Sequence, residues 1–163
     1  MEIGKHWAKI REVFDEAYKS CLHFAVASVN EDGSPHVTPI GALFLRENQT
    51  GFYFDEYPSK MPENLKRNPR VCILAVNADK LFWAKSLMEG KFSIPPAVRL
   101  TGTVGEVREA TSEEVAAWQE RIALAEGMKG YHLLWDRFGG HVRDIQFESF
   151  EPVYLGEMTE GLW

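Results

Sequence analysis

The sequence has little cysteine and no metal-binding motif. Only Cys21 and Cys72 occur among its 163 residues, which is too few for a disulfide framework. Both lie in apolar runs that predict buried, reduced thiols. The five histidines match neither HExxH nor a paired Cys/His spacing, so we expect no metal site. These absences argue against a disulfide-rich secreted fold and against a zinc enzyme.

Long apolar stretches are missing as well. The longest runs, such as Val71–Val76, are far shorter than the roughly 18 residues that predict a membrane span. The N-terminal segment MEIGKHWAKIRE lacks the apolar region of a secretory signal. We therefore expect a cytoplasmic protein that does not contact a membrane.

Basic residues are outnumbered by acidic ones. The chain has 18 Lys and Arg against 24 Asp and Glu, a net charge of −6, and an isoelectric point of about 5.4. A general basic field for nucleic acid is absent, so no nucleic-acid partner is expected. An anionic ligand would need donors that are arranged locally.

What the chain does have is the composition of an ordinary globular protein. Hydrophobic residues make up 45% and charged residues 26%, which excludes a disordered or collagen-like chain. The length fits one domain that covers residues 1–163.

Hydrophobic periodicity predicts a mainly β protein with peripheral helices. Helical spacing or capping signals predict helices over residues 4–20, 59–68 and 112–125, a short helix within 80–96, and helix and loop over 127–140. Strands are expected over 21–30, 36–45, 51–55, 70–76, 98–107, 142–150 and 153–156, about six in all.

Turns and glycines predict how these strands are arranged. Gly33 suits a tight hairpin turn, and such turns between successive strands favour an antiparallel sheet. Pro39 cannot donate to a sheet ladder, so the second strand should be broken or at an edge. Gly102 and Gly105 are expected bend or bulge points in a long strand. Together they predict a six-stranded antiparallel barrel.

The broken strand and the helix that follows it form the candidate site. A strand interrupted by Pro39 and opened by Gly41 leaves backbone groups that a flat heteroaromatic ring could use. Ser59 at a helix N-terminus and the Lys60 ammonium would form a local anion site. The alternative is that Ser59 only caps the helix and that the nearby basic side chains are a solvated face.

The order of these motifs resembles a known family. Residues 33–41 read GSPHVTPIG, and an aromatic strand, SK at 59–60, NL at 64–65 and NPRV at 68–71 follow. This order is similar to that of the pyridoxamine 5'-phosphate oxidase-like FMN-binding split barrels. The resemblance covers residues 22–76 well, and 98–109 and 142–155 more loosely. It implies a six-stranded split barrel that binds FMN noncovalently, and a homodimer with FMN at the subunit interface.

The resemblance also implies which residues bind the cofactor. A broken strand and the next aromatic strand would contact the flavin ring, and a Ser-basic pair would hold its phosphate. Met61 stands where relatives often have a second basic residue, so Arg70 or Arg99 would compensate. The implied cofactor-binding residues are Thr38, Pro39, Ile40, Gly41, Phe54, Asp55, Ser59, Lys60, Asn64 and Arg99.

The departures from the family bear on the reaction. The true oxidases continue past the last strand into a segment whose Arg and His hold the pyridoxal substrate, whereas here GEMTEGLW follows Leu155. Residues 112–125 also lack the Tyr, Arg and Ser that grip the substrate phosphate, for which Trp118 and Arg121 are only loose substitutes. Vitamin oxidation is therefore not expected.

We instead expect a flavin-dependent oxidoreductase, an NAD(P)H-driven reductase of flavin or of a small acceptor. No side chain is expected to act as a catalytic group, because bound FMN carries the chemistry. One alternative is a non-catalytic dimer that binds or senses flavin or haem. Another is a deazaflavin-dependent reductase on the same barrel.

Overall fold

A computed structural model describes residues 1–136 and 140–163, so residues 137–139 of the predicted 127–140 stretch lie outside the described residues. The helices are α1 Ile3–Cys21, α2 Lys60–Arg67, α3 Lys80–Glu89, α4 Ser112–Ile122, the 3₁₀ turn η1 Ala123–Ala125 and α5 Lys129–Trp135. The strands are β1 Phe24–Val29, β2 Pro35–Ile40, β3 Leu43–Leu45, β4 Thr50–Phe54, β5 Arg70–Val76, β6 Ala97–Glu109 and β7 His141–Pro152.

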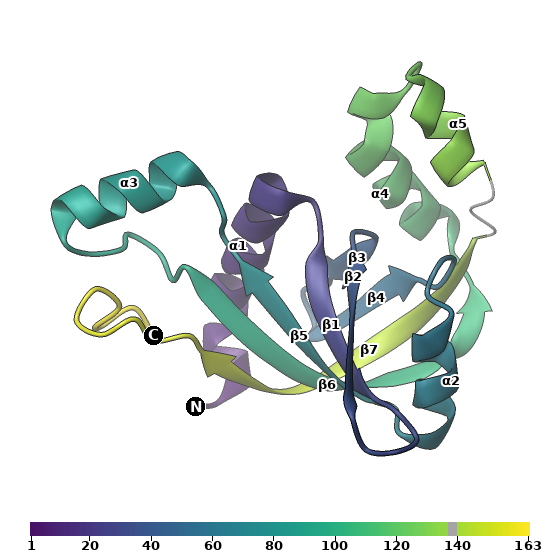
Figure 1. Cartoon of the computed structure of the whole chain (residues 1–163), viewed down its shortest axis with the longest axis horizontal. Coiled ribbons are helices and arrows are strands. Elements are labelled where there is room, and N and C mark those ends of the chain that lie inside the picture. Colours follow the sequence, from purple (N-terminus) through teal and green to yellow (C-terminus); the bar gives the residue numbers. More distant parts are fainter. Residues whose placement is uncertain (137–139) are drawn as a thin grey trace.

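All these strands form one antiparallel sheet in the order β2-β1-β5-β6-β7-β4-β3. Its two edge strands, β2 and β3, are consecutive in the chain and only Gly41 and Ala42 separate them. The sheet must therefore curl until its two edges meet at these residues, which we call the seam. This is the expected split barrel (Figure 1).

The strand count and two strand limits differ from the prediction. The described sheet has seven strands rather than six, because the predicted 36–45 strand divides at the seam into β2 and β3. Residues 153–156 form no strand of this sheet, since the chain leaves it after Pro152 and turns. Gly102 and Gly105 do mark irregularities, because the β6–β7 register shifts beside each of them.

The main core lies between the sheet and the helices α1 and α2. Trp7, Ile10, Phe14 and Ala17 recur at helical spacing and turn one face of α1 into this core. On β1, buried residues alternate with half-buried or exposed ones, so one face of that strand is covered more completely than the other. The cysteines are free and half-buried rather than buried, and Cys21 ends α1 instead of starting a strand.

A second, smaller core holds α4 and α5 against the other face of β4. Side chains alternate along this strand, so Tyr53 faces the main core while Phe52 and Phe54 face Trp118 and Ile122 of α4. Together α4, η1 and α5 form an arm that projects from the sheet, well separated from α3 at the opposite end (Figure 1). In the described part of the chain, no helix is both long and apolar enough to cross a membrane.

Candidate functional site

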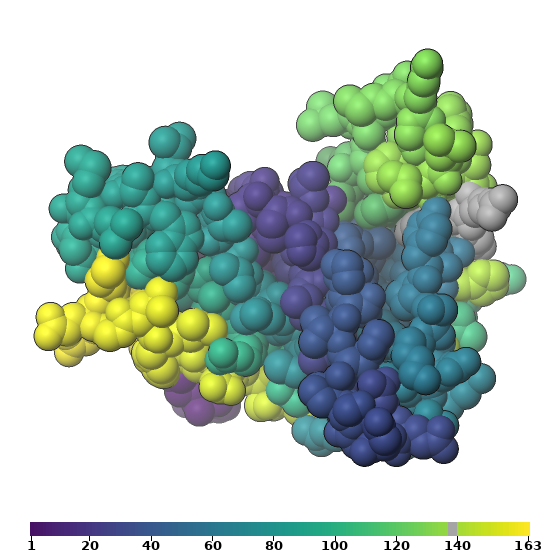
Figure 2. All heavy atoms as spheres, viewed as in Figure 1, coloured from purple at the N-terminus to yellow at the C-terminus, as the bar shows by residue number. Residues whose placement is uncertain are grey.

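A cavity of about 440 Å³ lies where the seam meets the arm. Its sheet wall is formed by Pro39, Ile40, Gly41, Ala42 and Phe54. The surface is hollowed between the end of α1 and the arm (Figure 2). Cavities of this size and of mostly apolar lining are typical of small-molecule sites.

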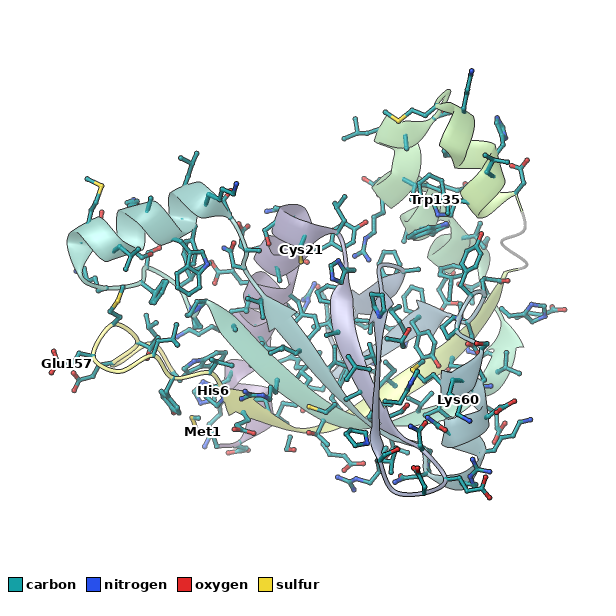
Figure 3. The ribbon with its side chains drawn as sticks, viewed as in Figure 1. Met1, His6, Cys21, Lys60, Trp135 and Glu157 are labelled. Atoms are coloured by element: carbon teal, nitrogen blue, oxygen red, sulfur yellow. The ribbon has the colours of Figure 1, made fainter. Side chains whose placement is uncertain are left out.

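The helical wall of the cavity comes from the arm. Trp118 lies with its ring centroid 6.1 Å from Phe54 and 6.0 Å from Trp135, so the aromatic surface is continuous from the sheet to α5. Trp135 lies on the arm, and Cys21 marks the end of α1 on the other side of the hollow (Figure 3). The Tyr57 hydroxyl donates to the Leu134 carbonyl and ties α5 to the loop before α2.

Gly41 is held close to the end of α1. Leu22 caps α1 in the left-handed region at φ 62°, and a Cβ at position 41 would lie 2.8 Å from its carbonyl oxygen. The close approach that requires a glycine is thus made to the Leu22 carbonyl. Contact between a bound ring and the Gly41 backbone stays a prediction.

Arg121 donates hydrogen bonds to two backbone carbonyls at the break between β2 and β3. Its Nη1 donates to the carbonyls of Gly41 at 3.0 Å and Leu43 at 2.6 Å. Its guanidinium also lies 3.6 Å from the Phe44 ring centroid and 4.0 Å from that of Tyr18. Arg121 therefore joins α4 to the seam and to α1, and fixes the shape of the cavity.

A charged network fixes the start of the arm. Glu114 accepts hydrogen bonds from Arg46 and Arg108 at 2.7 Å, and both arginines also bind Asp144 on β7. Glu114 further completes a capping box with Thr111 at the start of this helix. The hydrogen bonds from Arg108 lower the pKa of Glu114 to about 2, and likewise the pKa of Asp144 to about 2.

This network should make the fold sensitive to acid. A carboxylate whose pKa is lowered in the folded state stabilises the fold above its unfolded pKa, and this contribution is lost as the pH falls toward the folded value. We expect Glu114→Gln to lower the free energy of unfolding by about 2 kcal/mol near pH 7. The loss of stability on acidification between about pH 4.5 and 2 should also become smaller, because only Asp144 then contributes to it. Thermal unfolding followed by circular dichroism at several pH values measures both.

Glu113→Gln is the matched control, because Glu113 lies in the same first turn but is exposed. An equal loss of stability in the two variants would contradict the role given to the network.

The structure brings four of the ten predicted site residues into the cavity wall: Pro39, Ile40, Gly41 and Phe54. Thr38 lies on β2, half-buried and opposite Val26, and does not line the cavity.

Three other predicted residues have partners within the protein. Asp55 accepts from Arg143 Nε at 2.6 Å in a buried ion pair. Asn64 is fully buried and donates to Ser28 and Asn30, which ties α2 to the end of β1. Arg99 pairs with Glu151 at 3.3 Å, near the end of β6 that is remote from the cavity.

Ser59 and Lys60 begin α2, as predicted. Ser59 occupies the N-cap position, but its side chain makes no capping hydrogen bond. The Lys60 ammonium is exposed and lies 3.8 Å from Glu63, too far for a strong hydrogen bond. Tyr57 and Pro58 line the cavity, and only Ser59 separates Pro58 from Lys60 at the start of α2.

The sequence analysis named Trp118 and Arg121 only as loose substitutes for a phosphate grip, and it did not place the helical wall in the site. Trp118, Ile122 and Ala125 form an apolar stripe at helical spacing, and Arg121 interrupts it. A lone arginine on an apolar helix face is the signal that was available. Among the described residues, no group of three or more His, Cys, Asp or Glu side chains could hold a metal ion.

Residues 10–140 match the sequence model of the pyridoxamine 5'-phosphate oxidase family. The match spans the seam, α2, β6 and the arm, and so includes both walls of the cavity. No curated protein matches the chain significantly.

Solved structures with low sequence identity share the fold. An FMN-binding protein from Syntrophomonas wolfei is 13% identical over 93% of this chain and 94% of its own, with a TM-score of 0.58. HupZ from Group A Streptococcus is 18% identical over 87% and 91%, with a TM-score of 0.53. An F420 reductase is 14% identical over 85% and 95%, also with a TM-score of 0.53. At these identities the likeness concerns the fold alone.

Proposed function

Because the chain belongs to the pyridoxamine 5'-phosphate oxidase family, we propose that it is a flavoprotein that binds FMN noncovalently in the seam cavity. We further propose that it acts as an oxidoreductase, an NAD(P)H-driven reductase of flavin or of a small acceptor. The observation that carries the proposal is the cavity itself, whose sheet wall contains four of the residues that the family resemblance assigns to the ring.

The cavity suits a flat ring system. Pro39, Ile40 and Phe54 offer apolar surface along the sheet wall, and Trp118 beside Phe54 continues this surface onto α4. Planar side chains and backbone at this spacing favour an aromatic ligand over a flexible polar one. Pro39, Ile40 and Phe54 would hold the ring and exclude water from it.

A phosphate would bind at the start of α2. The first turn of a helix has free N–H groups and a partial positive charge, and here Lys60 adds a full one. The cavity-lining residues Tyr57 and Pro58 lead directly to this turn. Ring and phosphate of one FMN molecule therefore have neighbouring places in the chain.

Bound FMN would supply the redox chemistry by accepting a hydride or electrons. The protein's residues orient the ring and keep its neighbourhood apolar, so that a nicotinamide or acceptor meets it in a defined geometry. Vitamin oxidation is not part of the proposal, since residues 112–125 lack the Tyr, Arg and Ser set that the family resemblance assigns to the substrate phosphate.

We propose that a homodimer completes the site. Leu124 at the rim of the cavity is 95% exposed, and Leu133 on the same arm is 81% exposed. Large apolar side chains that remain this exposed favour contact with another protein surface. A second copy placed there would cover the mouth of the cavity.

A titration with FMN tests the proposal. The purified protein should bind FMN, and Lys60→Ala should weaken the binding by about 1 to 3 kcal/mol, because one charge-assisted contact is lost. Lys85→Ala on α3 is the control, since Lys85 also lies at long distance from a neighbouring glutamate, 3.9 Å from Glu89. Absorbance spectra and quenching of flavin fluorescence measure the affinity.

The response of bound flavin to NADPH without oxygen then separates the candidates. Bleaching of the flavin absorbance supports the reductase. Bound flavin that stays oxidised with NADPH and NADH favours a non-catalytic flavin protein. Binding of haemin but not FMN, or of neither, contradicts the proposed function.

A further inference from the structure

The seam cavity has a single charged residue among those of its lining that the structure describes, and that residue is Arg121. Its neighbours in the helical wall are Trp118, Ile122, Leu134 and Trp135. A cation is thus placed in surroundings that are otherwise apolar and aromatic.

Among the residues that the structure describes, Arg121 differs from the other partly buried arginines in that no carboxylate forms an ion pair with it. Arg46 and Arg108 bind Glu114 and Asp144, and Arg143 binds Asp55. In the described part of the chain no carboxylate lies within 4.0 Å of Arg121, and its hydrogen bonds go to two neutral carbonyls. Burial lowers the pKa of the Arg121 guanidinium to about 10, and electrostatic interactions with Tyr18 and Asp15 offset this only in part. A half-buried charge without a counter-ion is unfavourable.

The donors of Arg121 are only partly used. Nη1 makes both hydrogen bonds to the seam, whereas Nε and Nη2 donate to none of the described residues. The rings of Phe44 and Tyr18 fix the plane of the guanidinium. A guanidinium held in one plane with donors to spare suits a planar, two-oxygen acceptor.

We propose that the helical wall binds an aromatic carboxylic acid, with its carboxylate on Arg121 and its ring against Trp118 and Trp135. The substrate or acceptor of the protein belongs to this chemical class. The assignment rests on the proposed function in one respect, because it gives the sheet wall to the flavin and the helical wall to the second molecule. Binding of the acid to the apolar wall and to Arg121 does not itself require flavin.

Calorimetric titration with 2-naphthoate and with its neutral analogue 2-naphthamide tests the assignment. The flavin-free protein should bind the carboxylate about 10- to 100-fold more tightly than the amide, the range expected for a charge-assisted contact. This comparison uses the unaltered protein and so does not depend on whether a variant folds. Equal affinity for the two compounds overturns the proposal.

Two variants then assign the preference to Arg121. Arg121→Gln should abolish it, and Arg121→Lys should retain part of it, because lysine keeps the charge but loses the planar fork. Arg11→Gln on α1, whose partner Glu47 is 3.6 Å away and exposed, is the control and should keep the full preference. If Arg121 were only structural, Arg121→Gln would lower the melting temperature and leave the ratio of the two affinities unchanged.

Repeating the titration in the presence of FMN separates this proposal from the proposed function. A carboxylate preference that persists with FMN bound supports a separate ligand on the helical wall. Competition between FMN and naphthoate would show that the flavin's own anionic group pairs with Arg121, and would overturn it. Failure to bind FMN refutes the proposed function, whereas the naphthoate preference is still decided by the flavin-free titration.

Discussion

Gly102→Ala should destabilise the protein by about 3 kcal/mol, whereas Gly105→Ala in the same strand should stabilise it by roughly 0.5 to 1 kcal/mol. A Cβ at position 102 would lie 2.5 Å from the Gln146 carbonyl oxygen and 3.1 Å from side-chain carbons of Ile145 and Phe147. The backbone of β7 would have to move, because a carbonyl oxygen cannot rotate out of the way. At position 105 the nearest atom is the Asp144 carbonyl oxygen at 3.7 Å, an ordinary contact.

Urea unfolding followed by tryptophan fluorescence measures both changes. The two glycines lie beside the two register shifts of the β6–β7 pair, so the comparison keeps the strand pair constant, although Gly102 is buried and Gly105 is exposed. Equal effects of the two substitutions would mean that the close approach at Gly102 is not what the strand requires.

The second large effect is expected at the buried pair of Asp55 and Arg143. Their side chains are 5% and 11% exposed, and Arg143 also donates to the Gly105 carbonyl. Removing one partner leaves the other charged and buried, so Asp55→Leu and Arg143→Met should each cost about 3 to 5 kcal/mol. The double variant should cost much less than the sum, because no unpaired charge remains.

Arg11→Gln, which removes an exposed ion pair, should change stability by less than about 1 kcal/mol. Additive losses in the double variant would refute the coupling. An FMN titration of the folded double variant would test, in addition, the predicted contact between Asp55 and flavin.

Most of the helices and strands are predicted correctly from local signals. The apolar stripe of α1, the capping box of α4 and the turn at Gly33 each depend on residues a few positions apart. The break in the 36–45 strand is predictable from Pro39. No local signal shows that its two parts, β2 and β3, lie at opposite edges of the sheet. That arrangement depends on β4 pairing with β7, about 90 residues away.

The candidate site shows the same difference between features set by local sequence and features set by tertiary packing. The sheet wall was predicted because its residues lie within one recognisable stretch, from Pro39 to Phe54. The helical wall was not, because Trp118 and Arg121 reach the seam only through the tertiary packing of α4. Asn64 and Arg99 were assigned to the cofactor from the family resemblance alone, and in this chain both side chains have partners within the protein.

The order of strands in the sheet has a consequence for how the chain folds. β1, β2 and β5 can pair early, whereas the β3–β4 hairpin joins the rest of the sheet only through β7, near the end of the chain. Closing such a long loop is slow, so the pairing of β4 with β7 is expected late in folding. The seam and the second core both need that pairing. A ligand of the cavity would therefore slow unfolding without speeding the early steps of folding.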